Sequence, residues 1–525
     1  MQRRLREPLC AVTLGVLCCG VLLVLHQAAL LYTAYSGHDQ AWYLIVADRV
    51  LQGAKLYGPY ASDTNPPMVV WFSMLPVLLS RVLPLSPTIC LRLVVLLLWI
   101  GSAVWCVRVL RSEENMEPPL LRALIGLGIL FVGLRMDPLE FGQREHLFVM
   151  LVLPYLFAVS TEVVERLSLM ERCALGIAAG LAVCFKPQQV LALIAAELVL
   201  IVVRRSVRRL VSPEVIALAV SCGFYLLAVR VLTPQYTKKM VPLLMDTYWG
   251  YGTSSVAGLL LATKWWMLLA VVLVATGLFL SRGSSLWMAV AVFGASSAGS
   301  LLSYAQQRTD WTYHRYPAAS FLFLGVGVLL LALAEPILVY WQRREIRRPV
   351  AVVCFVMASV AGFGFFPRQM AALRPQRSEV YRFLEGHRES RSAVVLSTAV
   401  FWVADVADLK LEWGIRSPCL WFLPAIVQNE EGPVAGRPFK RLGQEKLMAI
   451  SSLQRVEIAE DLNHFQPALV MVEHCDQKHP CQAIEGKNFD MLAWFLKEPQ
   501  FQEEWAHYER QPDGPPSFDV YARVP

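Results

Sequence analysis

Long apolar runs dominate the first two thirds of the chain, and short polar segments separate them. Most runs are roughly 17–25 residues long, the length that an α-helix needs to cross the hydrocarbon core of a bilayer. They predict about eleven membrane-spanning helices, at residues 8–33, 88–110, 119–135, 146–163, 172–186, 188–203, 213–232, 257–280, 285–303, 317–340 and 349–366. The pattern therefore predicts a polytopic α-helical membrane protein.

The first run follows a basic segment, MQRRLRE, as the apolar region of a secretory signal peptide does. It is longer than such a region usually is, and no small-residue cleavage site follows it. We therefore expect a retained first span whose N-terminus is cytoplasmic.

The apolar run 67–84 contains several prolines, so it predicts either a span or a helix lying in the membrane plane. If it does not cross, the Arg clusters of the later loops fall on the same side as the basic N-terminus. If it crosses, all of those clusters fall on the opposite side. Because Lys and Arg concentrate in cytoplasmic loops, we expect that 67–84 does not cross and that the C-terminal region is extracytoplasmic.

Residues 367–525 follow a different pattern, with shorter apolar segments and more charged residues. SEVYRFLEGHRES predicts an amphipathic helix, whereas AVVLSTAVFW and ALVMVEHC predict short buried strands. The sequence thus divides into a transmembrane domain at 1–366, with a first outer loop at 34–87, and a C-terminal α/β domain at 367–525.

The composition agrees with a membrane protein. Of the 525 residues, 56% are hydrophobic and 17% are charged, against about 25% charged residues in soluble domains. The net charge of +7 comes from Lys and Arg in short loops. We read it as a signal for membrane orientation and expect no nucleic-acid partner.

The segment HCDQKHPC carries the candidate metal or disulfide chemistry of the C-terminal domain. Cys475 and Cys481 have a spacing that can close a small disulfide loop in an oxidising compartment. Free thiols, or a zinc site that adds His474 and His479, are the alternatives. The two-pair pattern of a zinc ribbon is absent.

Charged and aromatic residues gather in the five loops that the topology places on the outer face. Ionisable residues at membrane depth are costly, so such a gathering marks a candidate site. The residues are Asp39, Asp48, Asp63, Asn65, Arg135, Asp137, Glu140, Gln143, Arg144, Glu145, His146, Lys186, Lys238, Lys239, Asp246, Tyr248, Trp249, Arg308, Asp310, Trp311, Tyr313, His314 and Arg315. Solvated loop charges and interfacial aromatics are the alternative interpretation.

Glycosyl transfer is the chemistry that this set favours. A carboxylate such as Asp39 can take a proton from an acceptor hydroxyl while a sugar's anomeric carbon is attacked. A phosphate leaving group needs no general acid, because cations can stabilise its charge. The candidate cations are Lys186, Lys238, Lys239, Arg308 and Arg315.

The segment 37–67 resembles the first outer loop of the GT-C superfamily of membrane glycosyltransferases. These include aminoarabinose transferases and protein mannosyltransferases. In these families an Asp follows the first span, then a Tyr, Ala and Gly-containing turn, then a His/Asn-Pro-Pro entry into a juxtamembrane helix. The matching residues are Asp39, Tyr43, Ala47, Gly53, Leu56, Tyr57, Asn65, Pro66 and Pro67.

The resemblance implies a polyprenyl-phosphate sugar donor and inverting transfer to a cell-envelope acceptor, with Asp39 as the base. Asp137 is the best positional match to the second outer-loop acid of the family, and Glu140 and Glu145 are close rivals. Some relatives hold a divalent metal with such acids, so metal dependence stays open, with Asp137 and Glu140 as possible ligands. Tyr43, Tyr57, Asn65, Glu140, Arg144, Glu145, Trp311 and His314 are expected to bind substrate together with the cations above.

Other functional classes remain open. An envelope polysaccharide polymerase or ligase would use a similar outer loop and a lipid-linked donor. A lipid-linked glycan transporter would place its ionisable residues near the bilayer midplane, and a sensor would need a cytoplasmic output domain. We expect the glycosyltransferase, in a bacterial inner membrane.

Overall fold

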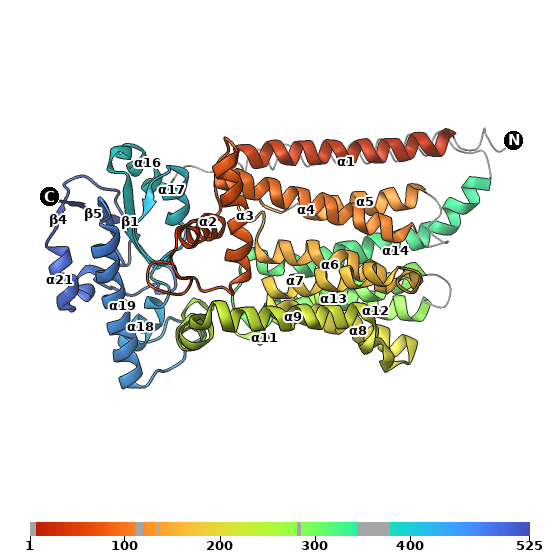
Figure 1. Ribbon diagram of the computed structural model, residues 1–525. Coiled ribbons are helices and arrows are strands. Elements are labelled where there is room, and N and C mark those ends of the chain that lie inside the picture. Colours follow the sequence, from red (N-terminus) through yellow and green to blue (C-terminus); the bar gives the residue numbers. More distant parts are fainter. Residues whose placement is uncertain (1–6, 112–118, 135, 281–284, 344–377, 525) are drawn as a thin grey trace.

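A bundle of long helices and a smaller α/β domain occupy opposite ends of an elongated molecule (Figure 1). The computed structural model describes residues 7–111, 119–134, 136–280, 285–343 and 378–524. The N-terminal end of helix α1 lies at the far end of the bundle, away from the α/β domain (Figure 1). The start of the first span and the C-terminal domain are thus at opposite ends of the bundle, as the predicted topology requires.

The bundle helices coincide with the predicted spans wherever the structure describes them. They are α1 (Glu7–Thr33), α4 (Pro87–Leu110), α5 (Pro119–Leu134), α6 (Arg144–Ser160), α7 (Leu169–Phe185), α8 (Val190–Arg204), α9 (Pro213–Leu232), α11 (Val256–Ala262), α12 (Lys264–Leu280), α13 (Ser285–Gln307) and α14 (Tyr316–Arg343). The predicted span 257–280 is divided into α11 and α12, which meet at 69°. The predicted span 349–366 and the domain boundary after residue 366 lie outside the described residues.

Six helices of the described chain are long and apolar enough to cross a membrane, or seven if the bent pair α11–α12 is one span. Helices α5, α6 and α7 have 16, 17 and 17 residues, somewhat fewer than the ~20 that a straight span needs. The chain is a polytopic helical membrane protein, as predicted. The number of eleven spans stays a prediction.

Two short helices connect the bundle to the C-terminal domain. Helix α2 (His38–Leu51) and helix α3 (Met68–Val82) lie between the two, and α3 runs across the direction of the bundle helices (Figure 1). Helix α3 has only 15 residues and contains Pro76. This is the arrangement expected of a segment that does not cross the membrane.

The C-terminal domain contains a five-stranded mixed sheet in the order β2-β1-β3-β5-β4. Its strands are β1 (Ser392–Leu396), β2 (Glu412–Trp413), β3 (Leu469–Glu473), β4 (Tyr508–Arg510) and β5 (Phe518–Arg523). Strand β1 pairs in parallel with β2 and β3, and β5 pairs antiparallel with β3 and β4. The helices around it are α16 (Glu379–Glu385), α17 (Trp402–Asp408), α18 (Leu423–Glu431), α19 (Gln444–Phe465), α20 (Met491–Phe495) and α21 (Pro499–Trp505).

The predicted helix at 378–390 and the predicted strand at 468–475 correspond to α16 and β3. The prediction of one continuous strand over AVVLSTAVFW was wrong in its second half. The strand ends at Leu396, and the Ser397 hydroxyl then accepts a hydrogen bond from the Ala399 amide at 2.8 Å. This local hydrogen bond turns the chain into α17.

Hydrogen bonds and ring contacts hold the C-terminal domain on the first outer loop. The Ser62 amide donates to the Arg416 carbonyl at 3.1 Å, and the Ser36 amide donates to the Asp408 carboxylate at 3.1 Å. The ring of Tyr60 stacks on His464, with 3.6 Å between the centroids. The domain is therefore positioned directly over the segment that carries the candidate site.

Candidate functional site

Asp39 lies in the first turn of α2, directly after the end of the first span. The extended backbone of Gly37 precedes the helix, and a Cβ there would collide with the Leu139 carbonyl, so glycine permits this close approach. An acidic residue in a first turn also interacts favourably with the helix dipole. The loop before α6 and the start of α2 are thus pressed together around Asp39.

The loop between α2 and α3 is held by its own side chains. The Tyr57 hydroxyl donates to the Asn65 carbonyl at 2.5 Å, and the Asn65 amide group donates to the Tyr43 hydroxyl at 3.3 Å. The Asp63 carboxylate accepts from the Asn65 backbone amide at 2.6 Å. Asp63 is 2% exposed, and this burial raises its pKa to about 7. Tyr43 and Tyr57 are buried supports, whereas Asn65 itself faces the cavity described below.

The second outer loop brings the acid Glu140 close to Asp39, and Gln143 bridges the two side chains. The Gln143 side-chain amide lies 2.7 Å from the Asp39 carboxylate and 3.1 Å from the Glu140 carboxylate, and it donates to both. Burial, with the nearby charge of Asp39 as a second cause, raises the pKa of Glu140 to about 8. A pKa of about 8 favours the neutral form of Glu140 at neutral pH.

These residues line a cavity of about 300 Å³ between the bundle end and the C-terminal domain. From the membrane part it is lined by His38, Asp39, Trp42, Thr64, Asn65, Glu140, Arg144, Tyr248, Tyr251, Asp310, Trp311, Thr312 and Tyr313. From the C-terminal domain it is lined by Val400, Phe401, Pro418, Cys419, Trp421 and Gln482. The predicted residues Asp39, Asn65, Glu140, Arg144 and Trp311 are thus brought together in one place.

Arg144 is the buried cation of this cavity. It is the first residue of α6 and is 7% exposed, and its Nε has no hydrogen-bond partner among the described residues. The carboxylates of Glu145 and Asp39 act on its charge from nearby, but a buried guanidinium whose hydrogen bonds are incomplete is costly. Because it faces a cavity, an anionic ligand there can supply the missing partner.

Three predicted residues form a closed cluster behind the cavity wall. The Lys186 ammonium lies 2.6 Å from the Glu145 carboxylate, and His314 Nε2 lies 3.5 Å from the same carboxylate. All three side chains are buried and none lines the cavity. The charge of Lys186 is already compensated, so this cluster supports the site from behind.

The remaining predicted residues lie outside the cavity lining. Lys238, Arg308 and Asp137 are exposed, and Asp137 accepts from the Leu139 amide at 2.9 Å within its own turn. Lys239 pairs with Glu457 of α19 at 2.9 Å, and Arg315 pairs with Asp310 at 3.2 Å. Of the two acids considered as metal ligands, Asp137 and Glu140, only Glu140 lines the cavity together with Asp39.

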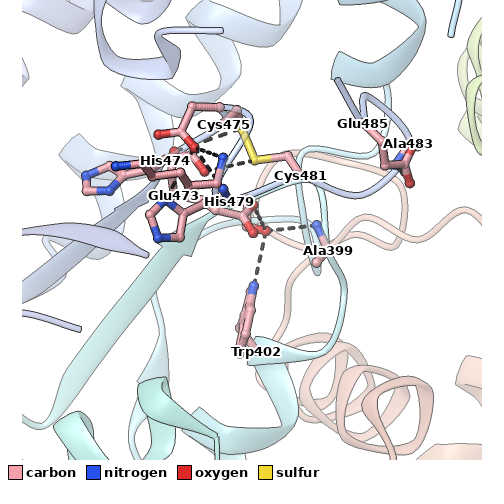
Figure 2. Close-up of a disulfide and its surroundings, with 12 residues drawn as sticks. Ala399, Trp402, Glu473, His474, Cys475, His479, Cys481, Ala483 and Glu485 are labelled. Atoms are coloured by element: carbon pink, nitrogen blue, oxygen red, sulfur yellow. Dashed lines mark hydrogen bonds and ion pairs between the residues drawn. A yellow bond between two sulfur atoms is a disulfide. The ribbon is translucent and has the colours of Figure 1, made fainter. Parts of the chain in front are cut away.

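Sequence reasoning did not identify the contribution of the C-terminal domain. Phe401, Cys419, Trp421 and Gln482 are far from Asp39 in the chain and carry no motif. The disulfide alternative was confirmed, because Cys475 and Cys481 are bonded to each other (Figure 2). Gln482 follows directly on this disulfide, and that position is the only signal that could have singled it out.

The carboxylates of the cavity do not match a dedicated metal site. Among the described residues, the one group of three close metal-ligand side chains is Glu473, Cys475 and Cys481, and its two sulfurs are joined in the disulfide. Around the cavity, Asp39 and Glu140 already share the Gln143 amide as donor. We therefore derive no step through a metal.

No family model matches the chain, and no curated protein matches it. Solved structures do. The apo form of ArnT from Cupriavidus metallidurans has a TM-score of 0.55 and 12% identity, with 98% of each chain covered. ArnT bound to undecaprenyl phosphate has a TM-score of 0.53 and 13% identity, covering 97% of this chain and 98% of that chain. An oligosaccharyltransferase from Archaeoglobus fulgidus has a TM-score of 0.45 and 12% identity, over 97% of this chain and 74% of that chain.

The two ArnT matches extend over both the helical bundle and the C-terminal domain, because they cover nearly all of each chain. At this low identity the likeness concerns the arrangement of the backbone. The predicted resemblance is confirmed at that level: this chain has the fold of the GT-C aminoarabinose transferase ArnT.

Proposed function

We propose that this protein is a membrane glycosyltransferase that moves a sugar from a polyprenyl-phosphate donor to a hydroxyl group of a cell-envelope acceptor. The observation that carries the proposal is that Asp39 and Arg144 line one cavity, in which Arg144 Nε has no hydrogen-bond partner among the described residues. A carboxylate and a buried cation with free hydrogen-bonding capacity are the two groups that transfer from a sugar phosphate needs. ArnT, which has the same fold, was crystallised bound to undecaprenyl phosphate.

In the proposed reaction the acceptor oxygen attacks the anomeric carbon of the sugar. Asp39 takes the proton of the acceptor hydroxyl as the new carbon–oxygen bond forms. The bond between the anomeric carbon and the phosphate oxygen breaks, and its electron pair leaves with the polyprenyl phosphate. Arg144 stabilises the charge on that phosphate. Attack from the face opposite the leaving group inverts the anomeric carbon.

Gln143 orients the Asp39 carboxylate, and Glu140 in its neutral form avoids adding a second negative charge beside it. The Gln143 amide fixes one oxygen of Asp39 at 2.7 Å. The other oxygen, which lies 3.8 Å from His38 Nε2, is the one that would take the acceptor's proton. Glu140 favours its neutral form at neutral pH because its pKa is raised to about 8. A neutral neighbour does not repel the negative phosphate, whereas a second carboxylate beside Asp39 would.

The reaction would take place on the extracytoplasmic side of a bacterial inner membrane. Arg204 ends α8, and Arg205 and Arg208 belong to the α8–α9 connection, at the end of the bundle away from the C-terminal domain (Figure 1). Positive loops are typical of the cytoplasmic side. The Cys475–Cys481 disulfide in the C-terminal domain is typical of an oxidising compartment.

The decisive experiment compares the purified wild-type protein with Asp39→Asn. Undecaprenyl phosphates that each carry one sugar would be supplied with envelope lipid and glycan extracts, and products would be detected by mass spectrometry. We expect wild type to form a glycosylated product and Asp39→Asn to lose roughly 10²–10⁴-fold in rate, at unchanged membrane abundance. Asp48→Asn is the matched control, because Asp48 is on the same helix, outside the cavity, and paired with Arg81.

Two results would overturn the proposal. An Asp39→Asn protein with full activity would show that Asp39 is not the base of the reaction. Movement of the lipid-linked sugar across sealed vesicles without any covalent product would identify a transporter instead.

A further inference from the structure

Gln482 is a polar residue of the C-terminal domain whose side chain makes no hydrogen bond to another described residue. It lines the same cavity as Asp39 and Arg144. Its side-chain oxygen is fully buried and has no hydrogen-bond partner in the described chain. Its side-chain nitrogen is not fully buried and makes no hydrogen bond to another described residue, so it is the group that can donate to a ligand in the cavity.

The chain on the N-terminal side of Gln482 is fixed covalently. Cys481, its immediate neighbour, is bonded to Cys475, as Figure 2 shows, and Cys475 lies two residues after the end of β3. Within the small loop that this bond closes, the Asp476 carboxylate accepts from the backbone amides of Lys478 and His479, each at 2.7 Å. The loop is therefore tied to the sheet and has its own internal hydrogen bonds.

The chain on the C-terminal side is fixed by hydrogen bonds. The Glu485 carboxylate accepts from the Ala483 amide at 3.0 Å and from Arg437 at 2.6 Å. The Gln428 amide group donates to the Ala483 carbonyl at 3.0 Å and to the Gly250 carbonyl at 3.3 Å. Gly250 belongs to the membrane part, so this anchor also sets the height of the loop over the cavity.

Gln482 thus stands between two anchors, lines the cavity, and makes no side-chain hydrogen bond to another described residue. Residues held so firmly are those that bind a ligand in one geometry, because little freedom is lost when the contact forms. Arg144 is supplied by the bundle and Gln482 by the opposite wall. A sugar that extends across the cavity from a phosphate at Arg144 would meet the wall to which Gln482 belongs.

We propose that Gln482 is a specificity-determining residue, whose amide group binds a hydroxyl of the donor's sugar. The disulfide loop at 475–481 is the device that positions it. This inference rests on the proposed glycosyltransferase function. A site that hydrogen-bonds a substrate hydroxyl discriminates against ligands that lack it, because its own polar group is then left unpaired.

The test measures binding of two probes, bare undecaprenyl phosphate and undecaprenyl phosphates that each carry one sugar. The wild type identifies the sugar whose attachment strengthens binding. Gln482→Ala should reduce this preference by roughly 3- to 10-fold, as expected for one neutral hydrogen bond, and leave the bare carrier's dissociation constant unchanged. Gln444→Ala, an exposed glutamine at the start of α19, should change neither.

The disulfide is tested in the same assay. The double variant Cys475→Ser with Cys481→Ser should lose the sugar preference as Gln482→Ala does. Added to Gln482→Ala it should cause no further loss, because both changes would remove one interaction. Full retention of the preference in the double variant would overturn the positioning role of the disulfide.

The outcomes separate this inference from the proposed function. If no sugar-loaded carrier binds better than the bare carrier and none is turned over, the proposed function fails. If one is bound and turned over, but Gln482→Ala keeps the full preference, only the role of Gln482 fails. A Gln482→Ala protein that changes the KM for the acceptor alone would likewise overturn the assignment to the donor's sugar.

Discussion

The Arg49 guanidinium of α2 donates to the main-chain carbonyl of Ile415 at 2.8 Å, across 366 residues of sequence. The same side chain also donates to the carbonyls of Tyr60, at 3.1 Å, and Trp413. Its guanidinium carbon lies 4.3 Å from the centroid of the Phe465 ring. One residue thus joins the helix that carries Asp39 to the domain that carries Gln482.

Arg49→Lys should loosen this junction. A lysine keeps the charge but has no planar fork of donors to reach three carbonyls. Hydrogen bonds from a charged group contribute about 1.5–3 kcal/mol each, so we expect a lower Tm and faster proteolysis of the C-terminal domain. Arg81→Lys is the control, because that arginine is exposed and makes one ion pair with Asp48. Equal Tm values for the two variants would contradict this role of Arg49.

Glu140 should make the stability of the protein fall as the pH rises. Burial raises its pKa from 4.5 to about 8 in the folded state. The folded state therefore holds a proton that the unfolded chain releases at lower pH, so its stabilising effect is complete below about pH 4.5 and is lost as the pH rises through 8. We expect Tm to fall over this window in the wild type.

Glu140→Gln should remove this component, because glutamine does not titrate. The measurement is Tm at intervals between pH 5 and 9 for both proteins. Glu503→Gln, an exposed change on α21, should keep the wild-type slope. If Glu140→Gln keeps that slope as well, then the carboxyl group of Glu140 is not held neutral in the folded protein.

Arg144→Gln should weaken the binding of bare undecaprenyl phosphate. Loss of a charge-assisted hydrogen bond corresponds to roughly a 10- to 100-fold higher dissociation constant. Arg144→Lys should recover part of the affinity, since an ammonium keeps the charge without the bidentate geometry. Arg308→Gln is the control, because Arg308 is exposed and outside the cavity lining. An unchanged dissociation constant for Arg144→Gln would show that the phosphate of the carrier does not bind at Arg144.

The sequence was sufficient to predict the membrane fold and the position of Asp39 at the end of the first span. Apolar runs mark spans wherever they occur, and Asp39 follows the first of them directly. The prolines of 67–84 and the distribution of arginines predicted that α3 would not cross, and α3 lies across the bundle (Figure 1). These features are local, or follow from counting charges, so they need no knowledge of tertiary contacts.

Pairing among the charged residues was not predictable in the same way. Lys186 and Arg144 are both cations of the predicted outer face, but Lys186 is compensated by Glu145 at 2.6 Å while Arg144 faces the cavity. The difference depends on how α6 and α7 meet. The contribution of Gln482 depends on how the C-terminal domain docks, which no periodicity or spacing encodes.

Helix contact in the bundle gives a last prediction, at Gly176 of α7. A Cβ at this position would collide with the backbone carbonyl of Glu214 on α9, and a Cβ at Gly180 would lie 2.7 Å from the Ser221 Cβ. Small residues allow such close helix packing in membranes. The contact also supports a buried ion pair, because Arg172 of α7 reaches the Glu214 carboxylate at 2.8 Å.

Gly176→Ala should therefore force α7 and α9 apart and lengthen this ion pair. Overpacking of this kind costs about 1–3 kcal/mol, so the Tm should fall. Gly223→Ala on α9 is the matched control, because nothing lies within 4 Å of a Cβ there. Alanine is the better helix former, so a purely intrinsic effect would raise the Tm of both variants. Only a collision between the helices lowers the Tm of Gly176→Ala while leaving that of Gly223→Ala unchanged or higher.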